Sequence, residues 1–502
     1  MIRKTSKELY AAYRESMRKI ADIRYASAVL QWDQETYLPP KGAAIRGQQI
    51  STLSEMAHQL FTEEKQGALL QELRMREDLT DKEKKNISLS WEDYEKQKKI
   101  PSAFVRELSD AVNKSFHSWI LARKENGFAK FSPELAHLVA LKKKEAEYLG
   151  YAEHPYDALL DEFDKGSTVN KLNKVFGDIR TPLKTLLDKI MAKPQVDDSF
   201  LRQHFPRDKQ WAFGLDILRR LGYDMEAGRQ DISEHPFTIN FNSNDVRVTT
   251  RIDENDFGAM TWSCIHEAGH ALYEQGLPEE EYGLPCGEAA SLTIHESQSR
   301  LWENHIGRSE AFCSFQFPLL QQYFPEQFGG LSAAELYKGI NKVQPSLIRT
   351  EADELTYHFH VMIRFDIEKA LIEGSLHAVD IPAFWNEQYA RYLNIEAPDD
   401  KRGCLQDIHW SHGSFGYFPT YSLGSFCAAQ LFDAARQSVP SLETGLDTGH
   451  YQPLLQWLRD NLHRQGRHYN SNELMINITG KEPGIDNFYQ YLLDKYKNIY
   501  NF

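Results

Sequence analysis

The chain has 502 residues, of which 41% are hydrophobic and 26% are charged, and its formal net charge is −14 at pH 7. This length and apolar content allow a large buried core. The acidity argues against nucleic acid and anionic membranes as main partners, because both attract basic surfaces. No run of 18 apolar residues is present, so no membrane-spanning segment is expected.

The N-terminal residues Met1–Ser6 lead into a mixed polar stretch without an apolar core, so we expect no signal peptide. The five cysteines are odd in number, scattered and without C-x-x-C spacing, which is typical of reduced thiols. We therefore expect a cytoplasmic protein. The cysteines are Cys264, Cys286, Cys313, Cys404 and Cys427.

Residues 1–234 have mainly helical patterns. Residues 1–60 place apolar side chains at helical spacing, and Pro39–Gly42 interrupts them. The densely charged stretch Lys82–Lys99 indicates a solvated helix face. Two further amphipathic helices are predicted at Phe104–Glu125 and Pro133–Leu149.

The pattern changes to period two within residues 235–252. Phe237–Phe241 and Val246–Val248 alternate, and the turn-like residues Asn242–Asp245 join them, which predicts a β-hairpin. An extended peptide can pair with an exposed strand edge through its main chain. A purely structural hairpin that caps the helical body fits the pattern equally well.

Helical spacing resumes in residues 253–305, which carry the motif H-E-x-x-H at His266–His270. Two histidines four residues apart share one helix face, so both imidazoles can reach one Zn²⁺. Glu267 can then take a proton from a water that the metal activates. The alternative is a helix with two solvated or capped histidines. Ligation by Cys264 is less favoured, because it lies two residues from His266 and projects from another side of the helix.

A catalytic zinc site needs a third protein ligand. The extended motif H-x-x-G-x-x-H is absent, because its glycine position holds Tyr273 and its last histidine position holds Gly276. A carboxylate on a second helix is therefore expected, and Glu288 and Glu296 are the near candidates.

Several ordered motifs resemble those of the carboxypeptidase Taq family of metallocarboxypeptidases. They are H-P-F at His235–Phe237, D-x-R-x-T at Asp245–Thr249, H-E-S-x-S at His295–Ser299, I-R-x-x-A-D at Ile348–Asp353 and G-x-x-Q-D-x-H-W at Gly403–Trp410. The resemblance implies that Glu296 is the third metal ligand. It also implies broad specificity, a homodimer, and a single peptidase domain over residues 1–502.

The fold that the resemblance implies is mainly α, a large grooved metallopeptidase of the gluzincin, neurolysin-like kind with one small β-sheet beside the active site. Residues 306–502 would form a helical part that carries substrate-binding segments. In the family, the D-x-R-x-T and G-x-x-Q-D-x-H-W segments close one end of the groove. Asp245, Gln406 and Asp407 are therefore candidate substrate-binding residues.

A carboxypeptidase needs a cation for the terminal carboxylate of its substrate, and arginine suits this role because it binds a carboxylate bidentately. The motif arginines are Arg247 and Arg349. The alternative for each is a buried ion pair, with Asp245 or Asp353 as partner.

The segment from Trp410 to Tyr421 is rich in donors for the oxyanion of a tetrahedral intermediate. The candidates are His409, His412, Tyr417 and Tyr421. For each tyrosine, packing with a satisfied hydroxyl is the more common role.

Together these features predict a zinc-dependent carboxypeptidase that hydrolyses the C-terminal bond of peptides with a free C-terminus. Co²⁺ is a substitute that the sequence does not distinguish from Zn²⁺. A gluzincin oligopeptidase or aminopeptidase would share the metal site but not the carboxylate anchor. A catalytically silent peptide-binding scaffold is the alternative from another class, although such a scaffold would not need Glu267.

Overall fold

The computed structural model of this protein describes residues 4–502. The described chain divides into two compact units, each built from three stretches of sequence. The first unit contains the chain up to Lys98, Asp198–Ile340 and Leu431–Glu482; the second contains Lys99–Asp197, Asn341–Gln430 and Pro483–Phe502. Residues 1–3, at the start of the N-terminal stretch Met1–Ser6, lie outside the described residues. The single peptidase domain over residues 1–502 stays a prediction.

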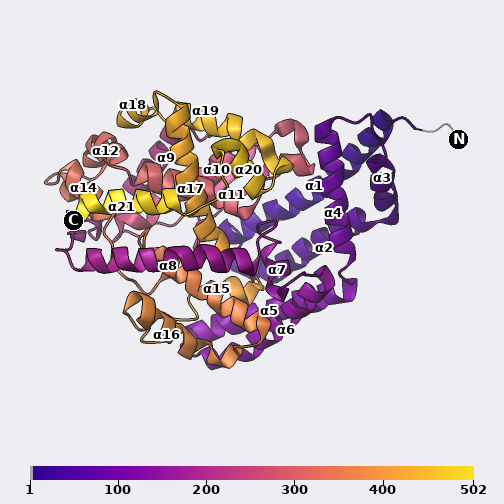
Figure 1. The fold of residues 1–502 in the computed structure, drawn as a ribbon, viewed down its shortest axis with the longest axis horizontal. Helices are drawn as coiled ribbons and strands as arrows, with labels where there is room; N and C mark the ends of the chain where they lie inside the picture. The colour runs from indigo at the N-terminus through magenta and orange to yellow at the C-terminus, as the bar shows by residue number, and fades with distance from the viewer. Residues whose placement is uncertain (1–3) are drawn as a thin grey trace. The chain divides into compact units, whose positions relative to one another are not determined.

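The first unit begins with a group of helices around an aromatic core. Helix α1 starts at a capping box in which the Thr5 hydroxyl and the Glu8 carboxylate each accept from the other residue's backbone N–H. Leu9, Tyr13 and Leu70 are buried in the core that α1, α2, α3 and α4 share. Figure 1 shows α1 and α2 side by side. These helices are α1 (Ser6–Thr36), α2 (Ala43–Thr62), α3 (Glu64–Arg74) and α4 (Asp81–Lys98).

The strands described in residues 4–502 form one three-stranded sheet in this unit, with the order β1-β3-β2. Strands β2 (Thr238–Asn242) and β3 (Asp245–Thr250) are antiparallel, with a register shift between Asn240 and Asn242, which confirms the predicted hairpin. Strand β1 (Gly228–Ile232) pairs in parallel with β3 and was not predicted. Its sequence, GRQDI, lacks the alternation of apolar residues on which strand prediction depends.

The remaining helices of the first unit follow the sheet or flank it. They are α9 (Arg207–Leu221), α10 (Phe257–Glu274), α11 (Leu292–Arg300), the π-helix η6 (Leu301–Gly307), α12 (Glu310–Tyr323), α13 (Pro325–Phe328), α14 (Ala333–Ile340), the end of α17 (Pro419–Ser438), α18 (Leu442–Asp447), α19 (Gln452–Asn461) and α20 (Ser471–Thr479).

The second unit is helical. Phe104, Leu138 and Leu141 belong to a small core that joins α5 and α6. Its helices are α5 (Ser102–Glu125), α6 (Ser132–Leu149), α7 (Pro155–Leu160), α8 (Val169–Met191), the 3₁₀ turn η7 (Arg349–Glu351), α15 (Tyr357–Glu373), α16 (Ile381–Leu393), the 3₁₀ turn η9 (His409–His412), the first part of α17 and α21 (Asp486–Tyr500).

The mainly helical class with one small sheet is confirmed. Helix α1 ends at Thr36, just before the predicted interruption at Pro39–Gly42, because a residue before proline avoids the helical conformation. Within the part of the chain that the structure describes, no helix is both long enough and apolar enough to cross a membrane.

Candidate metal centre

Helix α10 carries the H-E-x-x-H motif and follows the hairpin directly. It begins at Asp256, whose side chain accepts a hydrogen bond from the backbone N–H of Gly258 at 2.7 Å. Most of the helix is buried, including Ile265, Ala268 and Leu272. His266 and His270 share one face because they are four residues apart, and burial of the other faces fixes the rotation of the helix about its axis.

Helix α11 approaches α10 closely at Gly269. A Cβ atom at this position would lie 2.6 Å from both the carbonyl oxygen of Gln298 and the Cα of Ser299. Only a glycine therefore permits this distance between the two helix backbones. The close packing brings Glu296 of α11 opposite the two histidines.

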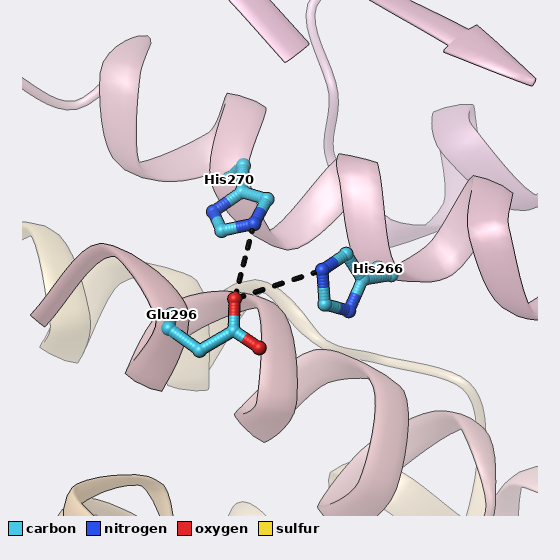
Figure 2. A group of neighbouring side chains, drawn as sticks. All are labelled: His266, His270 and Glu296. Atoms are coloured by element: carbon cyan, nitrogen blue, oxygen red, sulfur yellow. Dashed lines mark ion pairs between the residues drawn. The ribbon is translucent and has the colours of Figure 1, made fainter. Parts of the chain in front are cut away.

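Three side-chain atoms converge from the two helices (Figure 2). One Glu296 oxygen, Oε2, lies 3.7 Å from Nε2 of His266 and 3.5 Å from Nε2 of His270. Two ligands of a tetrahedral Zn²⁺ at bond lengths of about 2.1 Å are about 3.4 Å apart. The three residues therefore fit a metal ion of this size with small adjustments, and their nitrogen and carboxylate donors are those that zinc uses.

The charges around Glu296 favour its ionised form. Burial alone would raise the pKa of Glu296, but the Arg300 guanidinium and the two histidines hold it well below its usual range. Burial lowers the pKa of His270 to about 3, so this imidazole is neutral at pH 7. The pKa of His266 is instead raised, because two carboxylates, those of Glu296 and Glu303, outweigh its burial. Metal ions bind carboxylates and neutral imidazoles, so Glu296 and His270 favour metal binding, whereas a metal at His266 competes with a proton.

The π-helix η6 continues α11 and supplies a second carboxylate, Glu303. Its Oε2 lies 2.9 Å from Nδ1 of His266, the nitrogen away from the proposed metal position. Arg300 donates to Oε1 of Glu296 at 2.7 Å and to Oε2 of Glu303 at 3.2 Å, so one guanidinium holds both carboxylates. Arg308 donates to the other oxygen of Glu303 at 3.3 Å. A carboxylate on the outer nitrogen of a ligand histidine fixes the orientation of its ring.

Glu267 is buried, with 7% of its surface exposed, and is held from the sheet. The Thr238 hydroxyl on β2 lies 2.6 Å from Oε2 of Glu267 and 3.0 Å from its backbone carbonyl oxygen. Burial raises the pKa of Glu267, and the Thr238 hydrogen bond opposes this shift. A buried carboxyl with a raised pKa suits a group that must first accept a proton and then release it.

The other sequence candidates for the metal contact different groups. Glu288 lies 3.4 Å from Nη1 of Arg467 and is not part of the cluster of His266, His270 and Glu296. Cys264 is buried, and its sulfur lies 3.3 Å from Oε1 of Gln230. Cys286 is also buried, and its backbone N–H donates to Asn86. Neither thiol belongs to the cluster found in the described residues.

Arg247 of β3 is part of an ion pair in the first unit. It donates from Nε and Nη2 to the two carboxylate oxygens of Asp245, at 2.8 and 2.9 Å. Its guanidinium carbon lies 4.4 Å from the centre of the Trp32 ring and 4.9 Å from that of Phe241. The alternative of an Arg247–Asp245 ion pair therefore describes the geometry found here.

Arg349 is buried in the second unit, and its partner differs from the expected Asp353. Its Nε and Nη2 lie 3.0 and 2.9 Å from Oδ1 of Asp407, and its backbone N–H donates to Gln406 at 2.8 Å. Arg364, also buried, donates to Oδ2 of Asp407 at 2.6 Å. Asp353 instead accepts from backbone N–H groups at the start of α15. Two arginines around one aspartate leave one net positive charge in this buried cluster.

Two of the candidate oxyanion donors are hydrogen-bonded to each other. Nε2 of His409 lies 3.1 Å from the Tyr421 hydroxyl, and the Tyr417 ring centre lies 5.2 Å from those of both residues. Burial lowers the pKa of His409 to about 3, and Arg349 adds to the effect. His412 is exposed and lies beside the ring of Phe116. The side chains of His409, Tyr417 and Tyr421 thus form one group in the second unit.

Sequence reasoning did not predict the residues that surround the metal cluster. Glu303 and Arg300 contact it directly, and Glu274 contacts it through His295. Thr238 holds Glu267, and Arg364 holds Asp407. A signal was present for part of this set, because Arg300 and Glu303 follow Glu296 at helical spacing of four and seven residues.

A helical fold with H-E-x-x-H on one helix and a glutamate from the next defines a metallopeptidase of the gluzincin class. The family model for carboxypeptidase Taq (M32) metallopeptidases matches residues 12–496. The chain therefore belongs to this family of metallocarboxypeptidases, and the predicted family and activity are confirmed.

Individual relatives support this assignment over the full length. The chain is 38% identical to carboxypeptidase 1 of Bacillus subtilis, and the match covers 96% of this chain and 97% of that protein. The solved M32 carboxypeptidase of Deinococcus radiodurans is 38% identical and has a TM-score of 0.96, with 99% of this chain and 100% of that chain covered. A solved protein abbreviated CHT is 60% identical, with a TM-score of 0.95 and coverage of 97% and 99%.

Proposed function

We propose that this metallocarboxypeptidase uses Zn²⁺ held by His266, His270 and Glu296 to remove C-terminal residues from peptides with broad specificity. The observation that carries the metal assignment is the convergence of two imidazole nitrogens on one carboxylate oxygen at 3.5 and 3.7 Å. When bound, Zn²⁺ polarises the substrate carbonyl and lowers the pKa of the attacking water.

Glu267 is the proposed general base. It would accept the proton of the attacking water and return it to the leaving amine. Its burial and the hydrogen bond from Thr238 support this role, because they hold the carboxylate in place. Within residues 4–502 no salt bridge to Glu267 is found that would fix it in the charged form.

The carboxylate of the substrate needs a cation, and Arg349 and Arg247 remain the proposed candidates. The net positive charge of the cluster of Arg349, Arg364 and Asp407 supports a role in binding an anion. Asp407 and Gln406 would hold the Arg349 guanidinium in place, and Asp245 would do the same for Arg247.

For the oxyanion we propose a donor from His409, His412, Tyr417 and Tyr421. The hydrogen bond between His409 and Tyr421 supports these two, because a neutral histidine can accept from the tyrosine or donate to it. Strand β2 lies at one edge of the three-stranded sheet and is the proposed main-chain partner of an extended substrate.

The experiment that tests the proposed function is digestion of matched peptides that end in a free carboxylate or a carboxamide, followed by mass analysis. We expect stepwise loss of residues from the free C-terminus, inhibition by a chelator, and recovery with Zn²⁺. Internal cleavage, or equal cleavage of the amidated peptide, would identify an oligopeptidase instead.

The ligand assignment has its own test, which is the metal content of Glu296→Ala beside Glu288→Ala. We expect Glu296→Ala to lose metal as His266→Ala does, since only three protein ligands hold a catalytic zinc. A Glu288→Ala variant that loses its metal while Glu296→Ala keeps it would identify Glu288 as the third ligand instead.

We also propose a homodimer in the cytoplasm, with Co²⁺ able to replace Zn²⁺. The family resemblance supports the dimer, and five buried cysteines without disulfide-type spacing support a reducing compartment. Light scattering of the purified protein measures its oligomeric state. Metal analysis of protein purified from its native cells identifies the metal that is bound.

A further inference from the structure

His295 lies next to the proposed ligand Glu296 but has no part in the proposed metal site. Its Nδ1 lies 2.5 Å from Nδ1 of His270, the nitrogen opposite the one that faces Glu296. Its Nε2 lies 2.7 Å from Oε1 of Glu274 at the end of α10. The other oxygen of Glu274 accepts from Nδ2 of Asn240 on β2 at 2.6 Å. A chain of hydrogen bonds therefore runs from His270 to the sheet.

The direction of these hydrogen bonds follows from the groups that they join. Glu274 as a carboxylate can only accept, so Nε2 of His295 carries a proton. The Nδ1 of His295 is then the nitrogen that accepts, and it accepts the Nδ1–H of His270. His270 is left with a free lone pair on Nε2, the atom that faces His266 and Glu296 (Figure 2).

The opposite arrangement would prevent ligation. If the proton of His295 were on Nδ1 instead, its Nε2 lone pair would face the Glu274 carboxylate, and two acceptors would meet at 2.7 Å. His270 would then accept at Nδ1 and keep its proton on Nε2, where no metal could bind. Glu274 therefore selects the tautomer of His270 through His295.

Strand β2 holds one end of this series of hydrogen bonds and also contacts the proposed base Glu267. Asn240 and Thr238 are two residues apart on the strand, so both side chains project from the same face of the sheet. Asn240 donates to Glu274, and Thr238 donates to Glu267. The two glutamates lie seven residues apart on α10, which is about two helical turns. One face of β2 thus holds the proposed base, Glu267, directly. It holds the proposed ligand His270 through Asn240, Glu274 and His295.

We propose that His295 is a positioning residue that fixes the tautomer and ring orientation of His270, with Glu274 and Asn240 as its supports. The inference rests on the proposed function, because it takes His270 as a metal ligand. It differs from the contact of Glu303 with His266, where a carboxylate meets the ligand directly, because here a second histidine stands between them.

The test compares His295→Phe with His295→Gln in the full-length protein. Phenylalanine keeps a flat ring and removes both hydrogen bonds, whereas glutamine carries one acceptor and one donor. Loss of a group that orients a metal ligand commonly weakens metal binding about 10–100-fold. We expect this loss for His295→Phe, in competition of Zn²⁺ against a chelator, and substantial recovery for His295→Gln.

Two further measurements separate positioning from packing. The visible spectrum of the Co²⁺-substituted protein should change in His295→Phe and return toward wild type in His295→Gln. The matched control is His463→Phe, which removes another buried histidine of the same unit that packs on Tyr273 and contacts Gln298 instead of His270. We expect its metal affinity to equal that of wild type.

The inference is overturned if folded His295→Phe binds Zn²⁺ as tightly as wild type, or if His295→Gln and His295→Phe are equally weak. His266→Ala and His270→Ala, measured in the same way, test the proposed ligands separately. If these two variants retain their metal, the metal site itself is wrong. If they lose it while His295→Phe does not, only the positioning role fails.

Discussion

The close approach of α10 and α11 at Gly269 predicts the effect of one added methyl group. In Gly269→Ala, the new Cβ would lie 2.6 Å from backbone atoms of Gln298 and Ser299. Carbon atoms in favourable contact are about 3.5–4.0 Å apart. Because the contacted atoms belong to a helix backbone and cannot rotate away, α11 must move by about 1 Å.

The magnitude follows from two opposing contributions. Alanine in place of glycine favours a helix by about 0.5–1 kcal/mol. Overpacking a close contact costs about 1–3 kcal/mol. Because the new Cβ would lie between the backbone of α10 and that of α11, we expect a cost in the upper part of this range. We therefore expect Gly269→Ala to lower the free energy of unfolding by roughly 2 kcal/mol. A 1 Å displacement of Glu296 from the histidines should also reduce turnover, by about 10²-fold.

The assay is denaturant unfolding of the metal-free protein, together with Zn²⁺ titration and peptide hydrolysis. The control is Gly177→Ala in α8, where an added Cβ meets nothing within 4 Å. This variant should gain about 0.5–1 kcal/mol and keep its metal affinity. A Gly269→Ala protein as stable and active as Gly177→Ala would refute the argument that the helix contact sets the ligand geometry.

Three further predictions concern single groups. Glu267→Gln should keep its metal and lose about 10²–10⁴-fold in kcat, and near-normal turnover of the metal-replete variant would exclude it as the base. Arg349→Ala or Arg247→Ala, if folded, should lower kcat/KM for peptides with a free C-terminus by about 1.5–3 kcal/mol, while kcat/KM for amidated peptides should change little. If both folded variants keep the wild-type preference for free over amidated C-termini, neither arginine binds the terminal carboxylate. Burial raises the pKa of Glu368 to about 7, above its ordinary value of 4.5, so its contribution to stability should fall as pH rises from about 4.5 to 7. The stability of wild type relative to Glu368→Gln should therefore decline over this window, by up to about 3 kcal/mol, and a constant or rising difference would contradict the shift.

Local patterns in the sequence predicted much of the fold. The helices at Phe104–Glu125 and Pro133–Leu149 correspond to α5 and α6 within two residues, because their ends carry local signals. The hairpin followed from alternation and turn residues, and α10 follows its Asp256 cap. The convergence of Glu296 with His266 and His270 was expected from a family motif, since spacing alone left Glu288 equally eligible.

The rest depended on contacts between distant parts of the chain. Arg349 has Asp353 four residues away, yet it pairs with Asp407, because η7 turns the chain and Asp353 accepts the backbone N–H groups of Leu355 and Thr356. Strand β1 is similarly held by its parallel pairing with β3 rather than by its own pattern. Tertiary packing determines which of several chemically equivalent partners a residue contacts. Local sequence patterns do not predict this packing.

The wide turn of η6 decides which residues of this segment face one another. The backbone N–H of Arg308 bonds to the carbonyl of Glu303, five residues earlier, where an α-helix would span four. A regular α-helix over the same residues would place positions 303 and 308 about 140° apart around its axis, because each residue turns the helix by about 100°. Arg308 would then face away from Glu303 although every contacting side chain was still present. The wide turn of η6, as well as the two side chains, therefore keeps Arg308 against Glu303.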